Sequence, residues 1–194
     1  KSQSPIFAIY NYNVTHESGM WKRDKEELKV NPNDLKIIPP IFPDDSIVRH
    51  SLAVNYSNLI EMDRQVGKLI DHLKQEDIYD DSYIFFYSDH GGPFPRHKRA
   101  IYETGTKVPF FVKLPTGIKE KVDTNQFLSF VDFAPTVLSI AGINIPSFQQ
   151  GKPFLGKYKD DSKREYLFTS SDRFDEHPDR IRAVRGEKYK YIRN

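Results

Sequence analysis

The sequence predicts an α/β protein in which a parallel α/β portion precedes a smaller antiparallel portion. Two short and almost continuous apolar runs, residues 6–12 and 83–87, are typical of buried parallel strands. A segment with apolar residues at helical spacing separates them, and this order of strand, helix and strand predicts a right-handed parallel crossover. Segments in the last third alternate apolar and polar residues, which indicates antiparallel strands.

A polar segment, residues 13–45, follows the first predicted strand. Its scattered charges and four prolines predict a long loop, with a short helix near residues 25–29. From Ser46 the apolar residues return at helical spacing, and Asp44, Asp45 and Ser46 are candidate N-caps. We expect this helix to end near Gln75.

Shorter elements follow the second strand. Residues 108–113 predict a third apolar strand, and Asp132 with Pro135 predicts the start of a helix that Gly142 ends. The alternating segments then predict antiparallel strands at residues 166–170, 181–185 and 188–192, the last two joined by a tight turn at Gly186 and Glu187.

The bulk composition excludes several classes of protein. A chain of 194 residues with 38% apolar residues can form a packed core. Its net charge of +2 creates no overall field that would favour nucleic acid as a partner. No stretch approaches the ~20 apolar residues of a membrane span. The absence of cysteine removes disulfide and thiolate chemistry.

Polar residues follow the first two predicted strands at the edge where open parallel sheets bind ligands. His16 comes after the first strand, and Asp89 and His90 come directly after the second. Carboxylate oxygen and imidazole nitrogen are ligands of divalent cations, and Gly91 and Gly92 would let the backbone turn away from them. Taken alone, such a pair is more often a capping aspartate beside a packed histidine. The interpretation as a metal site therefore depends on the residues that surround the pair.

A basic cluster follows the two glycines, and it consists of Arg96, His97, Lys98 and Arg99. The two arginines and the lysine can donate charge-assisted hydrogen bonds to a tetrahedral anion. Four basic residues in a short span are usually a solvated face. Beside a metal pair, however, they predict a site that holds negative charge while a sulfuryl or phosphoryl group is transferred.

Four segments, in order, resemble the sulfatase family of the alkaline-phosphatase superfamily. YIFFYSDHG resembles the strand that leads to the family's calcium-binding pair, and HKRAIYETGTKVPFFVKLP resembles its lysine segment and the next strand. VDFAPTVLSIAGINIP and QGKPFLG resemble the helix and the segment that follow. The resemblance implies an alkaline-phosphatase-like sheet flanked by helices. Residues 1–145 would be part of the catalytic domain, and residues 146–194 part of a smaller antiparallel α+β subdomain.

The resemblance also implies roles for individual residues. Asp89 and His90 match the family's calcium ligands, although the nitrogen of His90 would suit zinc or manganese better than calcium. Lys98 matches the lysine that binds the sulfate group. His16 matches the histidine that contacts the sulfate and the leaving oxygen.

Departures from the commoner family pattern indicate a subgroup that resembles N-sulfoglucosamine sulfohydrolases and related glycan sulfatases. Arg99 and Thr104 stand where small residues or glycine are more usual. We expect Arg99, Arg173 and Arg182 to lie near the substrate. The implied partner is a sulfated carbohydrate or another sulfate ester, with hydrolysis at an ester or an N-sulfate left open.

Family members attack with a formylglycine made from Cys or Ser within a Cys/Ser-x-Pro-x-Arg motif, and the sequence contains no such motif. We therefore expect this chain to be a fragment that is inactive alone. Its formylglycine and the acidic pair that completes the calcium site would lie upstream. The resemblance further implies a periplasmic, secreted or lysosomal protein.

Two alternatives remain open. A metal-dependent phosphodiesterase or phosphonate hydrolase of the same superfamily would carry the same Asp-His pair and would prefer zinc or manganese. Such enzymes usually need further His or Asp ligands downstream, where this chain has Lys98, Tyr102 and Glu103. A non-catalytic glycan-binding relative would keep the basic pocket and lack the upstream nucleophile.

Overall fold

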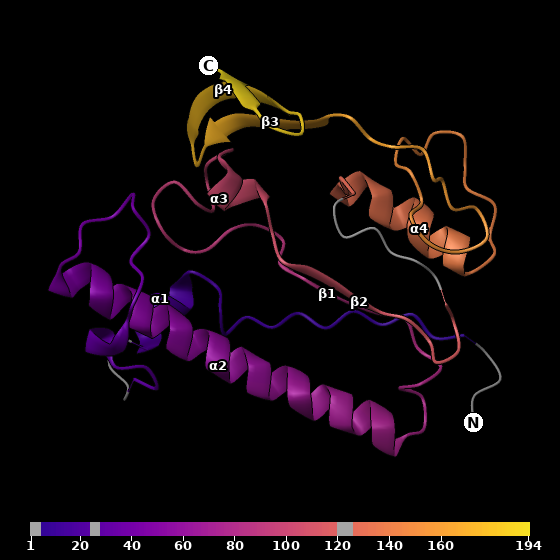
Figure 1. Ribbon diagram of the computed structural model, residues 1–194, viewed down its shortest axis with the longest axis horizontal. Helices are drawn as coiled ribbons and strands as arrows, with labels where there is room; N and C mark the ends of the chain where they lie inside the picture. The colour runs from indigo at the N-terminus through magenta and orange to yellow at the C-terminus, as the bar shows by residue number, and fades with distance from the viewer. Residues whose placement is uncertain (1–4, 24–27, 120–125) are drawn as a thin grey trace. The chain divides into compact units, whose positions relative to one another are not determined.

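The computed structural model describes residues 5–23, 28–119 and 126–194, and Figure 1 shows their helices and strands. The chain divides into two units. The first unit comprises residues 1–98 and 102–118, and the second comprises residues 99–101 and 119–194. The boundary predicted at residue 145 refers to the catalytic domain and the C-terminal subdomain that the family resemblance implies, and not to these two units. That boundary stays a prediction.

A long helix, α2 (Ser46–Gln75), is the main element of the first unit (Figure 1). Its start confirms the predicted cap, because the Asp45 carboxylate accepts a hydrogen bond of 2.8 Å from the Val48 backbone N–H. The buried part of the helix is short and includes polar residues: Leu52, Ala53, Val54, Ser57 and Asn58. The helix was therefore predicted correctly, whereas its later apolar positions are less covered than their spacing indicated.

A shorter helix, α1 (Ser18–Arg23), lies in the long loop that precedes α2. It packs closely, since a side chain at Gly19 would come within 2.6 Å of the Val14 carbonyl oxygen and 3.3 Å of the Asn58 amide nitrogen. The 3₁₀ helix η1 (Pro32–Asp34) follows later in the loop. The short helix predicted near residues 25–29 falls largely outside the described residues.

The two strands of the first unit pair antiparallel, which corrects the predicted parallel sheet. β1 (Ile84–Tyr87) pairs with β2 (Phe110–Lys113), and Tyr87 stands opposite Phe110. The connection contains only the short helix α3 (Glu103–Thr106). Because this connection does not carry the chain back to the start of β1, as a parallel crossover does, β2 runs in the opposite direction.

Residues 6–12 do not form the predicted strand, since within the described ranges they pair with neither β1 nor β2. The segment is also not buried, because Ile6 is 75% exposed and Phe7 is 71% exposed. An apolar run favours a strand only where a neighbouring strand supplies hydrogen bonds and cover. The predicted parallel crossover is therefore wrong for the described residues.

The second unit contains the predicted helix, α4 (Phe133–Ile140), preceded by the 3₁₀ helix η2 (Phe130–Asp132). Asp132 stands at the start of α4 as predicted, but its carboxylate does not cap that helix. It accepts hydrogen bonds of 2.8 Å from the backbone N–H groups of Ser129 and Lys152, and it pairs with Arg164. Gly142 ends the helix in the left-handed region, with φ of 71°.

A three-stranded antiparallel sheet completes the second unit and confirms the prediction for the last third of the chain. Its strands are β3 (Leu167–Phe174), β4 (His177–Arg185) and β5 (Lys190–Arg193), in that order in the sheet. The β3–β4 hairpin turns at Asp175, with φ of 51°. The described part of the chain contains no helix that is both long and apolar enough to cross a membrane.

Candidate active site

The segment after β1 delivers Asp89 and His90 to the end of the strand. The Ser88 hydroxyl donates a hydrogen bond of 2.6 Å to the His90 carbonyl, and the Gly91 N–H donates one of 3.0 Å to the Gly105 carbonyl. These bonds hold the segment against α3. The Lys98 backbone N–H donates a hydrogen bond of 3.2 Å to the Gly92 carbonyl, and this bond holds Lys98 close to the same turn.

Replacing Gly91 with alanine is expected to displace this turn, because the added methyl group would overlap the Thr104 carbonyl oxygen. Overpacking of this kind costs about 1–3 kcal/mol of stability. The same substitution at Gly67, where no atom lies within 4 Å of the added carbon, should instead stabilise α2 by about 0.5–1 kcal/mol. Chemical unfolding of both variants tests this contrast, and equal stabilities would contradict it.

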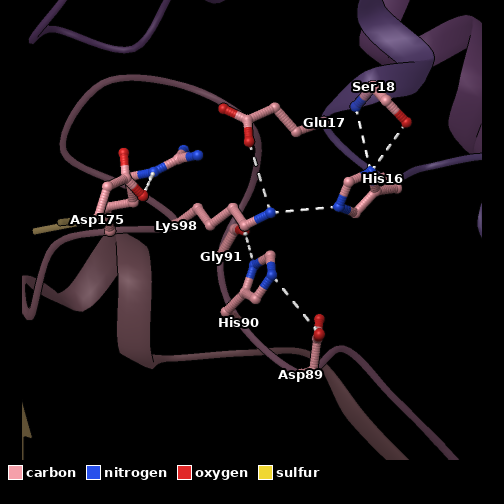
Figure 2. A network of polar contacts seen from close by, with 9 residues as sticks. His16, Glu17, Ser18, Asp89, His90, Gly91, Lys98 and Asp175 are labelled. Atoms are coloured by element: carbon pink, nitrogen blue, oxygen red, sulfur yellow. Dashed lines mark hydrogen bonds and ion pairs between the residues drawn. The ribbon is translucent and has the colours of Figure 1, made fainter.

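The Asp89–His90 pair presents two acceptors to one region of space (Figure 2). His90 Nδ1 lies 2.8 Å from the Gly91 carbonyl oxygen. A carbonyl only accepts, so Nδ1 must carry the proton, and Nε2 of the neutral ring keeps its lone pair. That Nε2 lies 3.5 Å from Asp89 Oδ2, and the Asp89 side chain is 83% exposed. A lone pair and a carboxylate oxygen at this separation suit two neighbouring ligands of a divalent cation.

A complete metal site is not present in the part of the chain that the structure describes. There, no three His, Cys, Asp or Glu side chains lie close enough together to hold a metal ion. Asp89 and His90 therefore fit a cation as a partial ligand set. Calcium would need further oxygen ligands in addition to this pair.

His16 lies just before α1, and its ring orientation is fixed locally. The Ser18 backbone N–H donates a hydrogen bond of 3.2 Å to His16 Nδ1, and the Ser18 hydroxyl lies 3.0 Å from the same atom. Because Nδ1 accepts from the backbone, Nε2 of the neutral ring carries the proton. The N–H of Nε2 is thus a donor that faces away from α1.

Lys98 Nζ lies 3.3 Å from His16 Nε2 and 3.5 Å from Glu17 Oε2 (Figure 2). The lysine and the His16 Nε2–H are both donors, so they cannot satisfy each other. Two converging donors are the arrangement that an oxyanion satisfies. The structure therefore brings together His16 and Lys98, which are far apart in the sequence and were both predicted as site residues.

Arg96 and His97, the other members of the basic cluster in the first unit, do not converge with Lys98. The Arg96 guanidinium lies over the Tyr102 ring, 4.6 Å from its centroid. The His97 ring lies 6.0 Å from the Phe42 ring and 5.8 Å from the Phe94 ring, and burial lowers the pKa of His97 below its ordinary value. Several basic residues were predicted to bind the anion together. In the first unit, Lys98 is the member of the basic cluster that lies beside His16.

The three arginines predicted near the substrate lie in the second unit. Arg99 pairs with Asp175 at 2.9 Å, and Arg182 pairs with Asp172 at 2.5 Å. Arg173 and Arg182 line a polar groove of about 460 Å³ on the β3–β4 hairpin. Their predicted role in substrate binding stays a prediction.

Glu17 is the site residue that sequence reasoning missed. Its side chain is 26% exposed, and that of Lys98 is 22% exposed, so the ion pair is partly shielded from water. The available signal was that Glu17 directly follows His16. A glutamate in a polar loop is ordinary, however, and only the folded chain shows that it reaches Lys98.

Comparison with known proteins gives one family match and several relatives. The family model described as Sulfatase matches residues 3–143. An ulvan-active sulfatase of Formosa agariphila is 37% identical over 98% of this chain and 37% of its own length. The human N-sulphoglucosamine sulphohydrolase is 31% identical over 68% of this chain and 26% of its own length. The chain thus spans only about a quarter to two fifths of the length of these relatives.

Solved structures show the same fold at lower identity. One is a complex with the substrate D-glucosamine-2-N,6-O-disulfate, with a TM-score of 0.60, 22% identity and coverage of 77% of this chain and 33% of the other. Another is a phosphonate monoester hydrolase from Silicibacter pomeroyi, with a TM-score of 0.62 and 21% identity. The match covers 93% of this chain and 39% of the hydrolase. These similarities confirm the predicted α/β fold class and carry no further conclusion about activity.

Proposed function

This chain belongs to the sulfatase family, and from that premise we propose that its full gene product hydrolyses sulfate esters or sulfamates of sulfated carbohydrates. The observation that supports this most directly is the convergence of His16 Nε2–H and Lys98 Nζ at 3.3 Å. A sulfate oxygen that lies beside the pair and faces both nitrogen atoms would accept a hydrogen bond from each. That contact would relieve the unfavourable approach of two donors.

The roles of the chain's own residues follow from this geometry. Lys98 would hold a sulfate oxygen and stabilise the negative charge on it during bond breaking. His16 would donate a hydrogen bond from its Nε2–H to the leaving oxygen or nitrogen and so stabilise the negative charge that develops there. The hydrogen bond from the Ser18 N–H keeps this proton on the nitrogen that faces the substrate.

Two groups outside the described residues complete the proposal. Asp89 and His90 would hold a divalent cation, proposed to be calcium, which would supply positive charge to the sulfate oxygens. A formylglycine from a Cys/Ser-x-Pro-x-Arg segment elsewhere in the gene product would supply the nucleophile. On this proposal the described chain alone is inactive, because it has no such segment.

The proposed substrate class is a sulfated glycan. Relatives named for ulvan and for N-sulphoglucosamine support this class, as does a structural neighbour bound to a disulfated glucosamine. Arg99, Arg173 and Arg182 are proposed to bind its anionic groups by bidentate hydrogen bonds. The proposed location is periplasmic, secreted or lysosomal, where such glycans are encountered.

The experiment that tests this function is a substrate panel with the full gene product. We expect release of sulfate from nitrophenyl sulfate and from ulvan oligosaccharides or N-sulfated glucosamine. Sequencing the DNA upstream of Lys1 should also reveal the Cys/Ser-x-Pro-x-Arg motif. A gene product that carries the motif and releases no sulfate from any of these substrates would contradict the proposal.

A second candidate is hydrolysis of phosphonate monoesters or phosphodiesters. The structural similarity to a phosphonate monoester hydrolase favours it, as does the nitrogen ligand that His90 offers to zinc or manganese. Nitrophenyl phenylphosphonate in the same panel separates the two functions. Faster turnover of the phosphonate than of any sulfate, with zinc or manganese bound, would favour this second candidate.

A further inference from the structure

Glu17 places a negative charge beside the groups that are proposed to hold the sulfate. Its Oε2 lies 3.5 Å from Lys98 Nζ, and Lys98 Nζ lies 3.3 Å from His16 Nε2. Figure 2 shows the carboxylate approaching the ammonium group from a different side than the His16 ring does. An anion that is hydrogen-bonded to both His16 and Lys98 therefore lies within a few ångströms of the Glu17 carboxylate.

A carboxylate in this position opposes a bound anion in proportion to the charge on that anion. The Coulomb interaction between two charges grows with the product of the charges and is weakened by solvent. The Glu17 and Lys98 side chains are only 26% and 22% exposed, so solvent screens this interaction incompletely. Each additional negative charge on the ligand should therefore cost measurable affinity.

Ester substrates of this superfamily differ in charge. A sulfate monoester and a phosphonate monoester each carry one negative charge. A phosphate monoester carries close to two above a pH of about 6, where its second proton is lost. The three groups have similar tetrahedral shapes, so shape alone separates them poorly.

We propose that Glu17 is a specificity-determining residue that selects singly charged esters over doubly charged phosphate monoesters at the His16–Lys98 site. This inference rests on the proposed function. Glu17 acts on the substrate through its charge, and it also positions the Lys98 ammonium group. Its carboxylate offsets part of the lysine charge when no anion is bound, which keeps the site from retaining phosphate.

The test compares Glu17→Gln with the wild-type gene product at a pH of about 8, where the phosphate ester is doubly charged. The measured quantity is the ratio of kcat/KM for nitrophenyl sulfate to that for nitrophenyl phosphate. Glutamine keeps the shape of the Glu17 side chain but removes its charge, so the second negative charge of the phosphate ester is no longer repelled. The ratio should therefore fall by about tenfold. The ratio of sulfate to nitrophenyl phenylphosphonate should stay constant, because those esters carry equal charge.

Two further variants separate this role from a structural one. Glu17→Asp keeps the charge and should preserve most of the preference for sulfate. Glu76→Gln removes the same charge at the end of α2, about 27 Å along the helix from Asn58, where α1 packs. It should leave both ratios unchanged. An unchanged sulfate-to-phosphate ratio in Glu17→Gln would overturn the inference.

A binding measurement separates failure of this inference from failure of the proposed function. If the gene product hydrolyses none of the esters, the proposed function fails. Calorimetric titration with methyl sulfate and methyl phosphate then still reports on Glu17. A preference for methyl sulfate that weakens by about tenfold in Glu17→Gln would support the inference, and an unchanged preference would refute it.

Discussion

Replacing Lys98 with alanine in the full gene product is expected to lower kcat/KM for a sulfate ester by a factor of about 10²–10³. The side chain is three-quarters shielded from water and converges with His16 Nε2–H at 3.3 Å. Its removal takes away a preorganised positive charge, and no other member of the basic cluster in the first unit lies in position to replace it. Steady-state kinetics with nitrophenyl sulfate give the measurement.

Two matched variants sharpen the Lys98 prediction. Lys98→Arg keeps the positive charge but changes its shape and reach, so it should recover only part of the rate. Arg96→Ala removes a charge two positions away that lies over the Tyr102 ring, and it should leave the rate nearly unchanged. A Lys98→Ala enzyme with wild-type turnover would show that Lys98 does not hold the sulfate.

Replacing Asp89 with alanine is expected to weaken binding of the divalent cation and to abolish most of the activity. Loss of an outer partner of a metal ligand typically costs about 10–100-fold in affinity, and loss of a direct ligand should cost at least as much. The Asp89 side chain is 83% exposed, so its removal should not unfold the protein. Calcium titration and metal analysis of the purified gene product give the measurement.

Asp81→Ala is the matched control, since it removes an exposed aspartate in the same unit, before β1 rather than after it. His90→Asn tests the identity of the ion. An amide oxygen suits calcium, so calcium binding should persist or strengthen, whereas a zinc or manganese site should lose affinity with its nitrogen ligand. Equal metal content in wild type and Asp89→Ala would remove Asp89 from the metal site.

The elements that could be predicted from the sequence are those with a local signal. Helix α2 has a capping aspartate at its start and apolar residues at helical spacing, and these are properties of the segment itself. The sheet of β3, β4 and β5 has alternating residues and short turns, which lead to antiparallel neighbours without long-range information.

The direction of pairing between β1 and β2 could not be predicted in the same way. An apolar run such as residues 83–87 fits a parallel or an antiparallel neighbour equally, and the choice depends on where the connecting segment leads. Here the segment between the strands stays at the end where β1 stops, since the Ser88 N–H reaches the Pro109 carbonyl at 3.4 Å. This contact joins residues on either side of the connecting segment, so the apolar pattern of the strands alone does not predict it.

The candidate site divides along the same line. His16, Lys98, Asp89 and His90 were predicted because they follow apolar segments and match the family motif residue by residue. Their roles stay proposals, whereas the fold class and the family are shown. The packing of His97 against Phe42 and Phe94, and the placement of Glu17 beside Lys98, depend on side-chain contacts that motif spacing does not encode.

The two-stranded sheet of β1 and β2 has a consequence for handling the protein. Within the described residues neither strand has a second neighbour, and large apolar side chains on both are open to solvent, with Phe111 63% exposed and Tyr87 44% exposed. Unpaired strand edges act as templates on which other chains add strands, which leads to aggregation. Concentrated samples of this chain alone are therefore expected to self-associate, and the full gene product is the form to purify and assay.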